Sequence, residues 1–160
     1  MMKKFLIVVI LMMSAACAEA KNISIDNFIY RFNSVPGHSL SKQSMQFTSG
    51  AINDSYMINY AECLNLSLFV KHGTPGFVQG YVIYGGDKTG SYAEHALVLM
   101  GELFYAAGAI DDVSETMAVL KKLGLNNLQS DTTNSIIRNG WKLFLTSNSL
   151  FGIMCGVEKP

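Results

Sequence analysis

Apolar residues recur along this chain with two different periods, and the period changes where the expected elements change. In residues 91–124 they are spaced three and four apart, which places them on one face of a helix that lies on a core. The residues of this stripe are Ala96, Leu99, Met100, Leu103, Phe104 and Ala107. A second helical segment ends with Lys121, Lys122 and Gly124, a basic last turn followed by a glycine. We therefore predict a helical hairpin over residues 91–124.

Both halves of this hairpin begin with the same capping pattern. Ser91 and Glu94 have the spacing of a capping box, and Asp112 and Glu115 repeat it where the second half starts. Asp111 adds a third carboxylate next to the second of these capping boxes. A metal site or an acid/base site is therefore the alternative to capping there. We favour capping, because no histidine or further acid nearby completes a set of metal ligands.

Strands are expected where apolar residues alternate with polar ones. In residues 62–70 leucine or valine stands at positions 64, 66, 68 and 70, and Cys63, Asn65 and Ser67 point to the other face. This pattern is typical of a half-buried strand in an antiparallel sheet with one wet face. The other expected strands are residues 45–47, 56–60 and 77–84 before the helical hairpin, and residues 136–145 and 150–157 after it, joined by a turn at 146–149.

A first helix is predicted over residues 25–32, where Ser24 is placed to cap an apolar stripe. The order of elements is therefore helix, three or four strands, two helices and two strands, or α-β-β-β(-β)-α-α-β-β. This order predicts an α+β fold, an antiparallel sheet of about five to six strands with helices packed on one face in a two-layer sandwich. We expect the two apolar faces to meet, with Leu99, Leu103 and Phe104 packing against Leu64, Leu66 and Leu68.

Residues 1–20 have the features of a secretory signal peptide. Two lysines precede an apolar run at residues 5–13, and residues 18–20 form a small-x-small cleavage site. The apolar run is shorter than the roughly 20 residues of a transmembrane helix. A second processing route stays open, because Cys17 ends a segment close to a bacterial lipobox, although Ser14 stands where leucine is usual. We expect cleavage after residue 20 and a periplasmic or secreted protein, with a lipid anchor on Cys17 as the alternative.

The remaining residues, 21–160, have the length of a single domain and almost no net charge. The full chain has 12 basic and 12 acidic residues, and the leader contains two lysines and one glutamate, so the mature chain has a net charge near −1 with histidine neutral. Nucleic-acid binders have a basic stripe, which is absent from this sequence. We therefore expect another protein as the partner, no nucleic acid, no cofactor, no metal and no transmembrane segment after the leader.

Two cysteines remain in the mature chain, Cys63 and Cys155. In an oxidising compartment, a pair without metal-ligand spacing is most simply a disulfide, and two separate buried thiols are the alternative. A disulfide needs Cα atoms within about 7 Å of each other. Cys63 lies within the expected strand at 62–70, on its polar face. The bond would therefore place the strand at 150–157 beside this strand, or bring their ends together.

Few residues suggest catalysis or ligand binding. Residues 85–90 are a glycine-rich loop between a strand and a helix, the context of an anion site, but the P-loop order is absent and we interpret the loop as a connector. His38 is expected in a solvated loop, and His95 and Glu102 lie away from the apolar stripe and are expected to face solvent. The residues that could serve a hydrolase are Asp87, His95, Asp111 and Asp112, none with a partner at a characteristic spacing.

Three short segments and the element order resemble known groups of proteins. The segments SGAIND (49–54), KKLGL (121–125) and RNG (138–140) are similar to segments of small exported bacterial proteins without an assigned activity. This resemblance spans most of the mature chain and implies no catalytic residue. The element order resembles that of type III secretion chaperones in topology alone. Those chaperones are cytoplasmic dimers, so the leader argues against the same function here.

These features favour an exported, non-catalytic binding protein of the bacterial envelope, such as an inhibitor, an immunity-type factor or an accessory factor. The alternative is a small extracytoplasmic hydrolase whose residues come together only in the fold. A cleft with a histidine within hydrogen-bond reach of a carboxylate would favour this alternative.

The leader generates a first testable prediction. Mass spectrometry of the exported protein should find a chain that begins at Lys21, because residues 18–20 fit the small-x-small rule. A diacylated chain that begins at Cys17 would contradict this prediction and would place the protein on a membrane.

Overall fold

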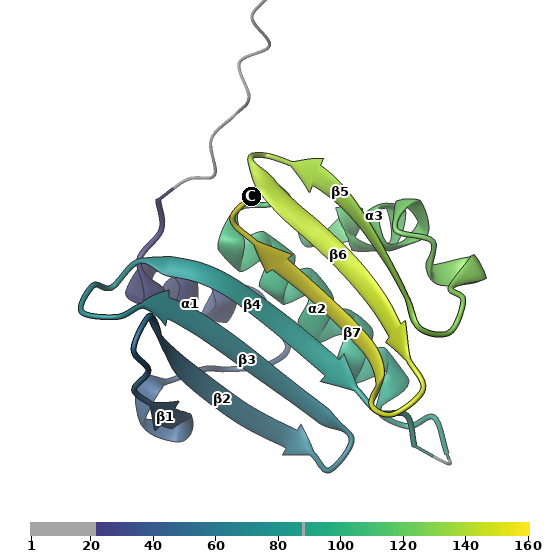
Figure 1. Ribbon diagram of the computed structural model, residues 1–160, viewed down its shortest axis with the longest axis horizontal. Helices are drawn as coiled ribbons and strands as arrows, with labels where there is room; N and C mark the ends of the chain where they lie inside the picture. The colour runs from purple at the N-terminus through teal and green to yellow at the C-terminus, as the bar shows by residue number, and fades with distance from the viewer. Residues whose placement is uncertain (1–21, 88) are drawn as a thin grey trace, which may run out of the picture.

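The computed structural model describes residues 22–87 and 89–160, which form two layers (Figure 1). One layer is a seven-stranded antiparallel sheet, and the helices lie on one of its faces, as the α+β prediction requires. The helices are α1 (Ile25–Asn33), α2 (Ala93–Ala107) and α3 (Thr116–Lys122), with short 3-10 helices η2 (Lys42–Ser44), η3 (Val113–Glu115) and η4 (Leu125–Asn127). The strands are β1 (Gln46–Thr48), β2 (Asn53–Ala61), β3 (Leu64–Lys71), β4 (Phe77–Tyr84), β5 (Thr132–Arg138), β6 (Trp141–Asn148) and β7 (Gly152–Glu158).

The strand order is β1-β2-β3-β4-β7-β6-β5, and all neighbouring strands are antiparallel. The first four strands form one meander and the last three form another, and the two meanders meet where β4 pairs with β7. Between them the chain runs through the predicted helical hairpin and returns at the far edge as β5 (Figure 1). Helix α2 contacts β4 and β7, so it covers the junction of the two meanders.

The predicted contact between the leucine-rich strand face and the helix stripe is confirmed. Leu64, Leu66, Leu68, Leu99, Leu103 and Phe104 are all fully buried in one cluster. Gly80 of β4 allows the two layers to approach closely, since a Cβ there would lie 2.8 Å from Leu103 Cδ1 and 3.1 Å from Leu68 Cδ2. Leu68 and Leu103 therefore both pack against Gly80, where β4 has no side chain.

Helix α1 completes the core at one end of the sheet. Ser24 caps it as predicted, accepting a hydrogen bond from the Asn27 backbone N–H over 3.2 Å. Phe28 stacks on Phe77 of β4 with 4.6 Å between ring centroids, and Phe77 lies 5.5 Å from the buried ring of Trp141. This row of rings ties α1, β4 and β6 together.

The sheet has one strand more than the upper end of the expected range, because residues 136–145 are not a single strand. The chain reverses at Asn139 and Gly140, whose φ values are +48° and +76°. A two-residue turn with both residues in the left-handed region is a type I′ turn, and Asn-Gly is its preferred sequence. The next turn also differs, since β6 continues to Asn148 rather than ending at 145.

The two cysteines do not meet. β4 lies between β3, which follows Cys63, and β7, which contains Cys155, so these strands are not the neighbours that the expected disulfide would need. Cys155 pairs with Val82 of β4 and Leu145 of β6, and it is fully buried. Both cysteines are free thiols in this structure. Burial raises the pKa of the Cys155 thiol far above its ordinary value.

In the part of the chain that the structure describes, no helix has the length and apolar character needed to cross a membrane.

The core contact can be tested by truncating Leu103 to alanine. This side chain is fully buried above Gly80, so its loss leaves a cavity and should lower the free energy of unfolding by about 2–5 kcal/mol. Urea unfolding monitored by circular dichroism measures the change. Val98→Ala is the matched control, because Val98 lies on the same helix with 38% of its surface exposed. Equal, small effects of both substitutions would mean that the stripe does not face the sheet.

Candidate functional site

A histidine and a buried carboxylate form a close pair between the α1–η2 loop and α2. His38 Nδ1 lies 3.0 Å from Glu102 Oε2, and the His38 backbone N–H donates to Glu102 Oε1 over 3.2 Å. The Glu102 side chain is 1% exposed and the His38 side chain 17%. Both residues were expected to face solvent, and that prediction is wrong because the loop at 34–41 folds over the side of α2 that carries Glu102.

The loop at 34–41 is shaped to reach this carboxylate. Asn33 closes it, since the Asn33 side chain donates to the Leu40 carbonyl over 2.8 Å and accepts from the Leu40 N–H over 2.7 Å. Gly37 passes so close to Glu102 that a Cβ at this position would overlap the carboxylate oxygen Oε1. The loop therefore depends on a glycine there and uses both oxygens of Glu102.

Aromatic rings surround the pair. The His38 ring lies 4.9 Å from the Tyr60 ring and 6.0 Å from the His95 ring, measured between centroids. Burial, and secondly the charge of Glu102, raise the pKa of Tyr60, whose hydroxyl group has no hydrogen-bond partner among the described residues. Burial also raises the pKa of Glu102, although its hydrogen bonds and charge interaction with His38 act in the opposite direction.

A groove of about 340 Å³ lies beside the pair, between the α1–η2 loop, α2 and the start of α3. Glu102 forms part of its wall. The rest of the wall is mainly apolar and includes Val35, Pro36, Leu97, Val98 and Met117.

The His38–Glu102 pair has the geometry of a base and the group that orients it. When Nδ1–H donates to the carboxylate, the other ring nitrogen, Nε2, keeps its lone pair and can accept a proton. Among the described residues, no hydroxyl or thiol forms a hydrogen bond with the His38 ring. The pair can thus supply a base, and it also fastens the loop to α2.

The hydrolase candidates from the sequence are not brought together. Asp87 and His95 lie near the start of α2, whereas Asp111 and Asp112 follow its end. Helix α2 has 15 residues, which separates the two groups by about 20 Å. His95 is exposed, as predicted.

Asp87 caps the start of α2 in place of the predicted Ser91–Glu94 capping box. Its carboxylate accepts hydrogen bonds from the backbone N–H groups of Thr89, Ser91 and Tyr92 at 2.9, 3.0 and 3.1 Å. Hydrogen bonds from Thr89 and these N–H groups hold the pKa of Asp87 far below its ordinary value. The Asp87 carboxylate thus already accepts from the backbone N–H groups that an external anion would need in this loop.

In the carboxylate cluster at 111–115, the side chains of Asp112 and Glu115 act as caps, as predicted. Asp112 accepts from the Ser114 N–H over 2.7 Å, and Glu115 accepts from the N–H groups of Asp111 and Asp112 at 3.0 and 3.2 Å. Glu115 also pairs with Arg138 of β5. Among residues 22–87 and 89–160, no group of three or more His, Cys, Asp or Glu side chains is placed to hold a metal ion.

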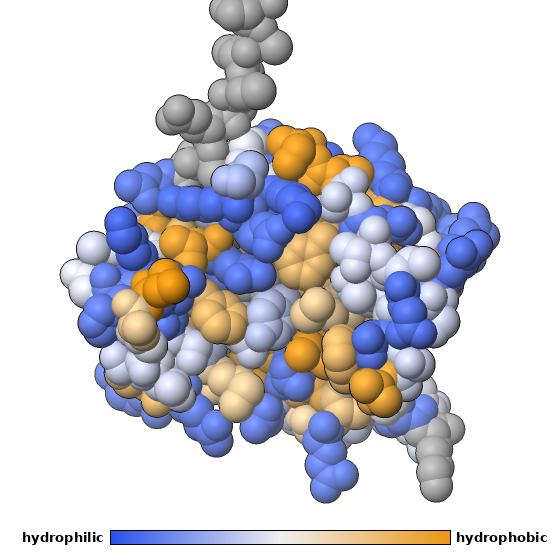
Figure 2. All heavy atoms as spheres, in the orientation of Figure 1, coloured by the Kyte–Doolittle hydropathy of each residue, from blue (hydrophilic) through white to orange (hydrophobic). Residues whose placement is uncertain are grey.

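The face of the sheet opposite the helices is a second candidate surface, and Figure 2 looks directly onto it. None of the described helices covers it. Pairing places Met57, Ser67, Tyr81, Gly156 and Phe144 in one row across five strands of this face.

Aromatic rings lie close against the backbone on this open face. A Cβ at Gly156 would overlap the Phe144 ring, so the ring lies over the glycine and is only 6% exposed. The rings of Phe69 and Tyr81 lie 5.5 Å apart. Ile83 and Met154 continue the apolar centre in the next row. Polar residues on the same face surround this centre, among them Gln46, Thr48, Asn59, Gln79, Lys142, Thr133 and Glu158.

No protein family, curated protein or solved structure matches this chain.

The buried carboxylate predicts a specific pH dependence. Because burial raises the pKa of Glu102 above its ordinary value of 4.5, the folded state binds more protons than the unfolded state above that pH. The stability of the wild type relative to Glu102→Gln should therefore be highest below about pH 4.5 and should fall as the pH rises. Urea unfolding of both proteins at a series of pH values measures this difference.

Asp54→Asn is the control with the opposite sign. The hydrogen bond from His72 lowers the pKa of Asp54, so any stability that this carboxylate contributes is lost as the pH falls below its ordinary value of 3.8. The opposite result would be a difference in unfolding free energy between wild type and Glu102→Gln that grows with rising pH. It would mean that the attraction between Glu102 and His38 outweighs the free-energy cost of burying the carboxylate.

Proposed function

We propose that this protein is an exported, non-catalytic binding protein of the bacterial envelope that holds a partner protein on the open face of its sheet. The observation that carries the proposal is the apolar and aromatic centre of that face, which none of the described helices covers. Aromatic and methionine side chains at the centre of a surface with a polar rim are typical of protein–protein interfaces. Export is proposed from the leader alone.

The open face has the area of a standard protein interface. Seven strands at about 4.8 Å spacing give a width of roughly 29 Å, and strands of about eight residues give a length of roughly 27 Å. The face is therefore roughly 800 Å², the area that each partner typically buries in a stable complex.

The charge on this face favours a protein partner over a nucleic acid. Lys142 on β6 is paired with Glu158 on β7, with 2.7 Å between its Nζ and the nearer carboxylate oxygen. The ion pair leaves little net charge in this part of the face. Affinity would then come from the aromatic centre, with the polar rim excluding water.

A small hydrolase is the second candidate, because the His38 ring lies within hydrogen-bond reach of the Glu102 carboxylate, 3.0 Å away. In this case His38 would act as general base, oriented by Glu102, whose side chain also lines the groove. Turnover of ester or amide substrates that is lost in His38→Gln and kept in His95→Gln would support it.

The binding proposal can be tested by capture of the partner from periplasmic extract with the tagged mature chain as bait. Phe69→Ser with Tyr81→Ser should abolish capture of a protein that the wild type retains, since both rings lie at the centre of the face. Tyr30→Ser is the matched control, because Tyr30 lies on α1 in the other layer with 77% of its surface exposed. Thermal melts should show that both proteins are folded. Equal capture by wild type, double variant and control would exclude the open face as the binding surface.

A further inference from the structure

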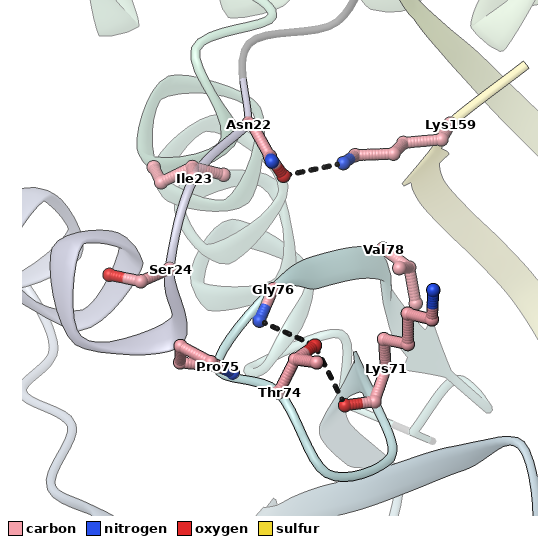
Figure 3. Close-up of a pocket in the computed structure, with 9 residues that line it drawn as sticks. All are labelled: Asn22, Ile23, Ser24, Lys71, Thr74, Pro75, Gly76, Val78 and Lys159. Carbon is pink, nitrogen blue, oxygen red and sulfur yellow. Dashed lines mark hydrogen bonds between the residues drawn. The ribbon is translucent and has the colours of Figure 1, made fainter.

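A second pocket, separate from the groove beside Glu102, lies at the end of the sheet where the described chain begins (Figure 3). Its volume is about 540 Å³, within the range of roughly 300–1,000 Å³ that is typical of small-molecule sites. Three distant parts of the chain line it. These are residues 22–24, the β3–β4 turn with its flanking residues Lys71 and Val78, and Lys159 at the C-terminal end.

Backbone hydrogen bonds hold these three parts in place. The Ile25 N–H donates to the Pro75 carbonyl over 2.7 Å, and the Phe77 N–H donates to the Ile23 carbonyl over 2.8 Å. The Lys159 N–H donates to the Val78 carbonyl over 3.0 Å. The lining is thus built from paired backbone, which holds its three parts together.

The pocket is positively charged. Among residues 22–87 and 89–160, Lys71 and Lys159 are its charged lining residues, and no acidic side chain lines it. Lys159 Nζ lies 3.1 Å from the neutral amide oxygen of Asn22, and among the described residues neither lysine forms an ion pair with a carboxylate. The neighbouring acid, Glu158, projects from the other face of the sheet and pairs with Lys142.

The amide group of Asn22 adds a donor to the two lysines. Asn22 uses its amide oxygen to accept from Lys159, which leaves its NH₂ group free to donate. The hydroxyl group of Ser24 caps α1 and points away from the pocket in Figure 3, so Ser24 contributes only to the wall. In Figure 3, Asn22 and Lys159 lie on one side of the pocket, and the Lys71 side chain extends from the opposite side to end beside Val78.

From this geometry we infer that the pocket binds a small phosphate monoester. The phosphate dianion matches the charge of two lysines and accepts from ammonium and amide donors together. The apolar side chains of Ile23, Pro75 and Val78 are available to the organic part of the ligand. This site is independent of the partner surface proposed above, because it lies at the end of the sheet and does not use the aromatic centre of the open face.

The test uses the exported protein, labelled with ¹⁵N, and titration with glycerol phosphate monitored by NMR. Saturable shifts of the Gly76, Thr74 and Lys159 amide signals are expected, and glycerol at the same concentrations should leave them unchanged. Lys71→Gln with Lys159→Gln should weaken binding about tenfold, as expected for the loss of one to two charge-assisted hydrogen bonds. Lys121→Gln with Lys122→Gln is the matched control, since it removes the same charge from exposed positions in α3 and should leave the affinity unchanged.

Three results would overturn the inference. The first is the absence of saturable shifts at the pocket with glycerol phosphate. The second is equal weakening by the two double variants, which would indicate a general charge effect. The third is equal affinity for acetate, which would indicate a site for any carboxylate or phosphate.

Discussion

The pairing of β4 with β7 is the contact on which the rest of the structure depends. It joins a meander of four strands to a meander of three, and its residues are distant in sequence, with Gln79 opposite Glu158. Neither meander could place α2 alone, because this helix lies on both strands of the junction. Leu103 above Gly80 is the close contact that fixes the helix there. Pairing across such a separation is slow to form, since a long loop must close before any contact is gained.

The periodic parts of the fold could be predicted from the sequence. The stripe around Leu103 and the alternation in residues 64–70 gave the helix, the strand and the contact between them, because both patterns come from a single buried face. The turn at Asn139 and Gly140 could also have been found from its Asn-Gly pair, but the residues on either side of it showed no clear alternation. The strand order could not be predicted from the sequence, because no local pattern indicates that β7 pairs with β4.

The His38–Glu102 pair could not be predicted from the sequence for a related reason. Glu102 lies off the apolar stripe of α2, and a charged residue in that position normally faces water. Its burial depends on His38, which is 64 positions away in a loop that has no periodic pattern. Asp87 was missed as a cap because it acts on Tyr92 from five positions away, outside the usual spacing. Long-range partners and unusual caps depend on the path of the chain, and the composition of a segment does not reveal that path.

The separation of the two cysteines would affect folding in any oxidising compartment. Cys155 is inert once β7 is in place, because a buried thiol with a raised pKa offers neither access nor thiolate to an oxidant. Before β7 inserts, both thiols are open to oxidation. A bond between Cys63 and Cys155 at that stage would keep β7 from its position, since β4 must lie between them. In an oxidising compartment, the yield of native protein would then be set by a race between strand insertion and thiol oxidation.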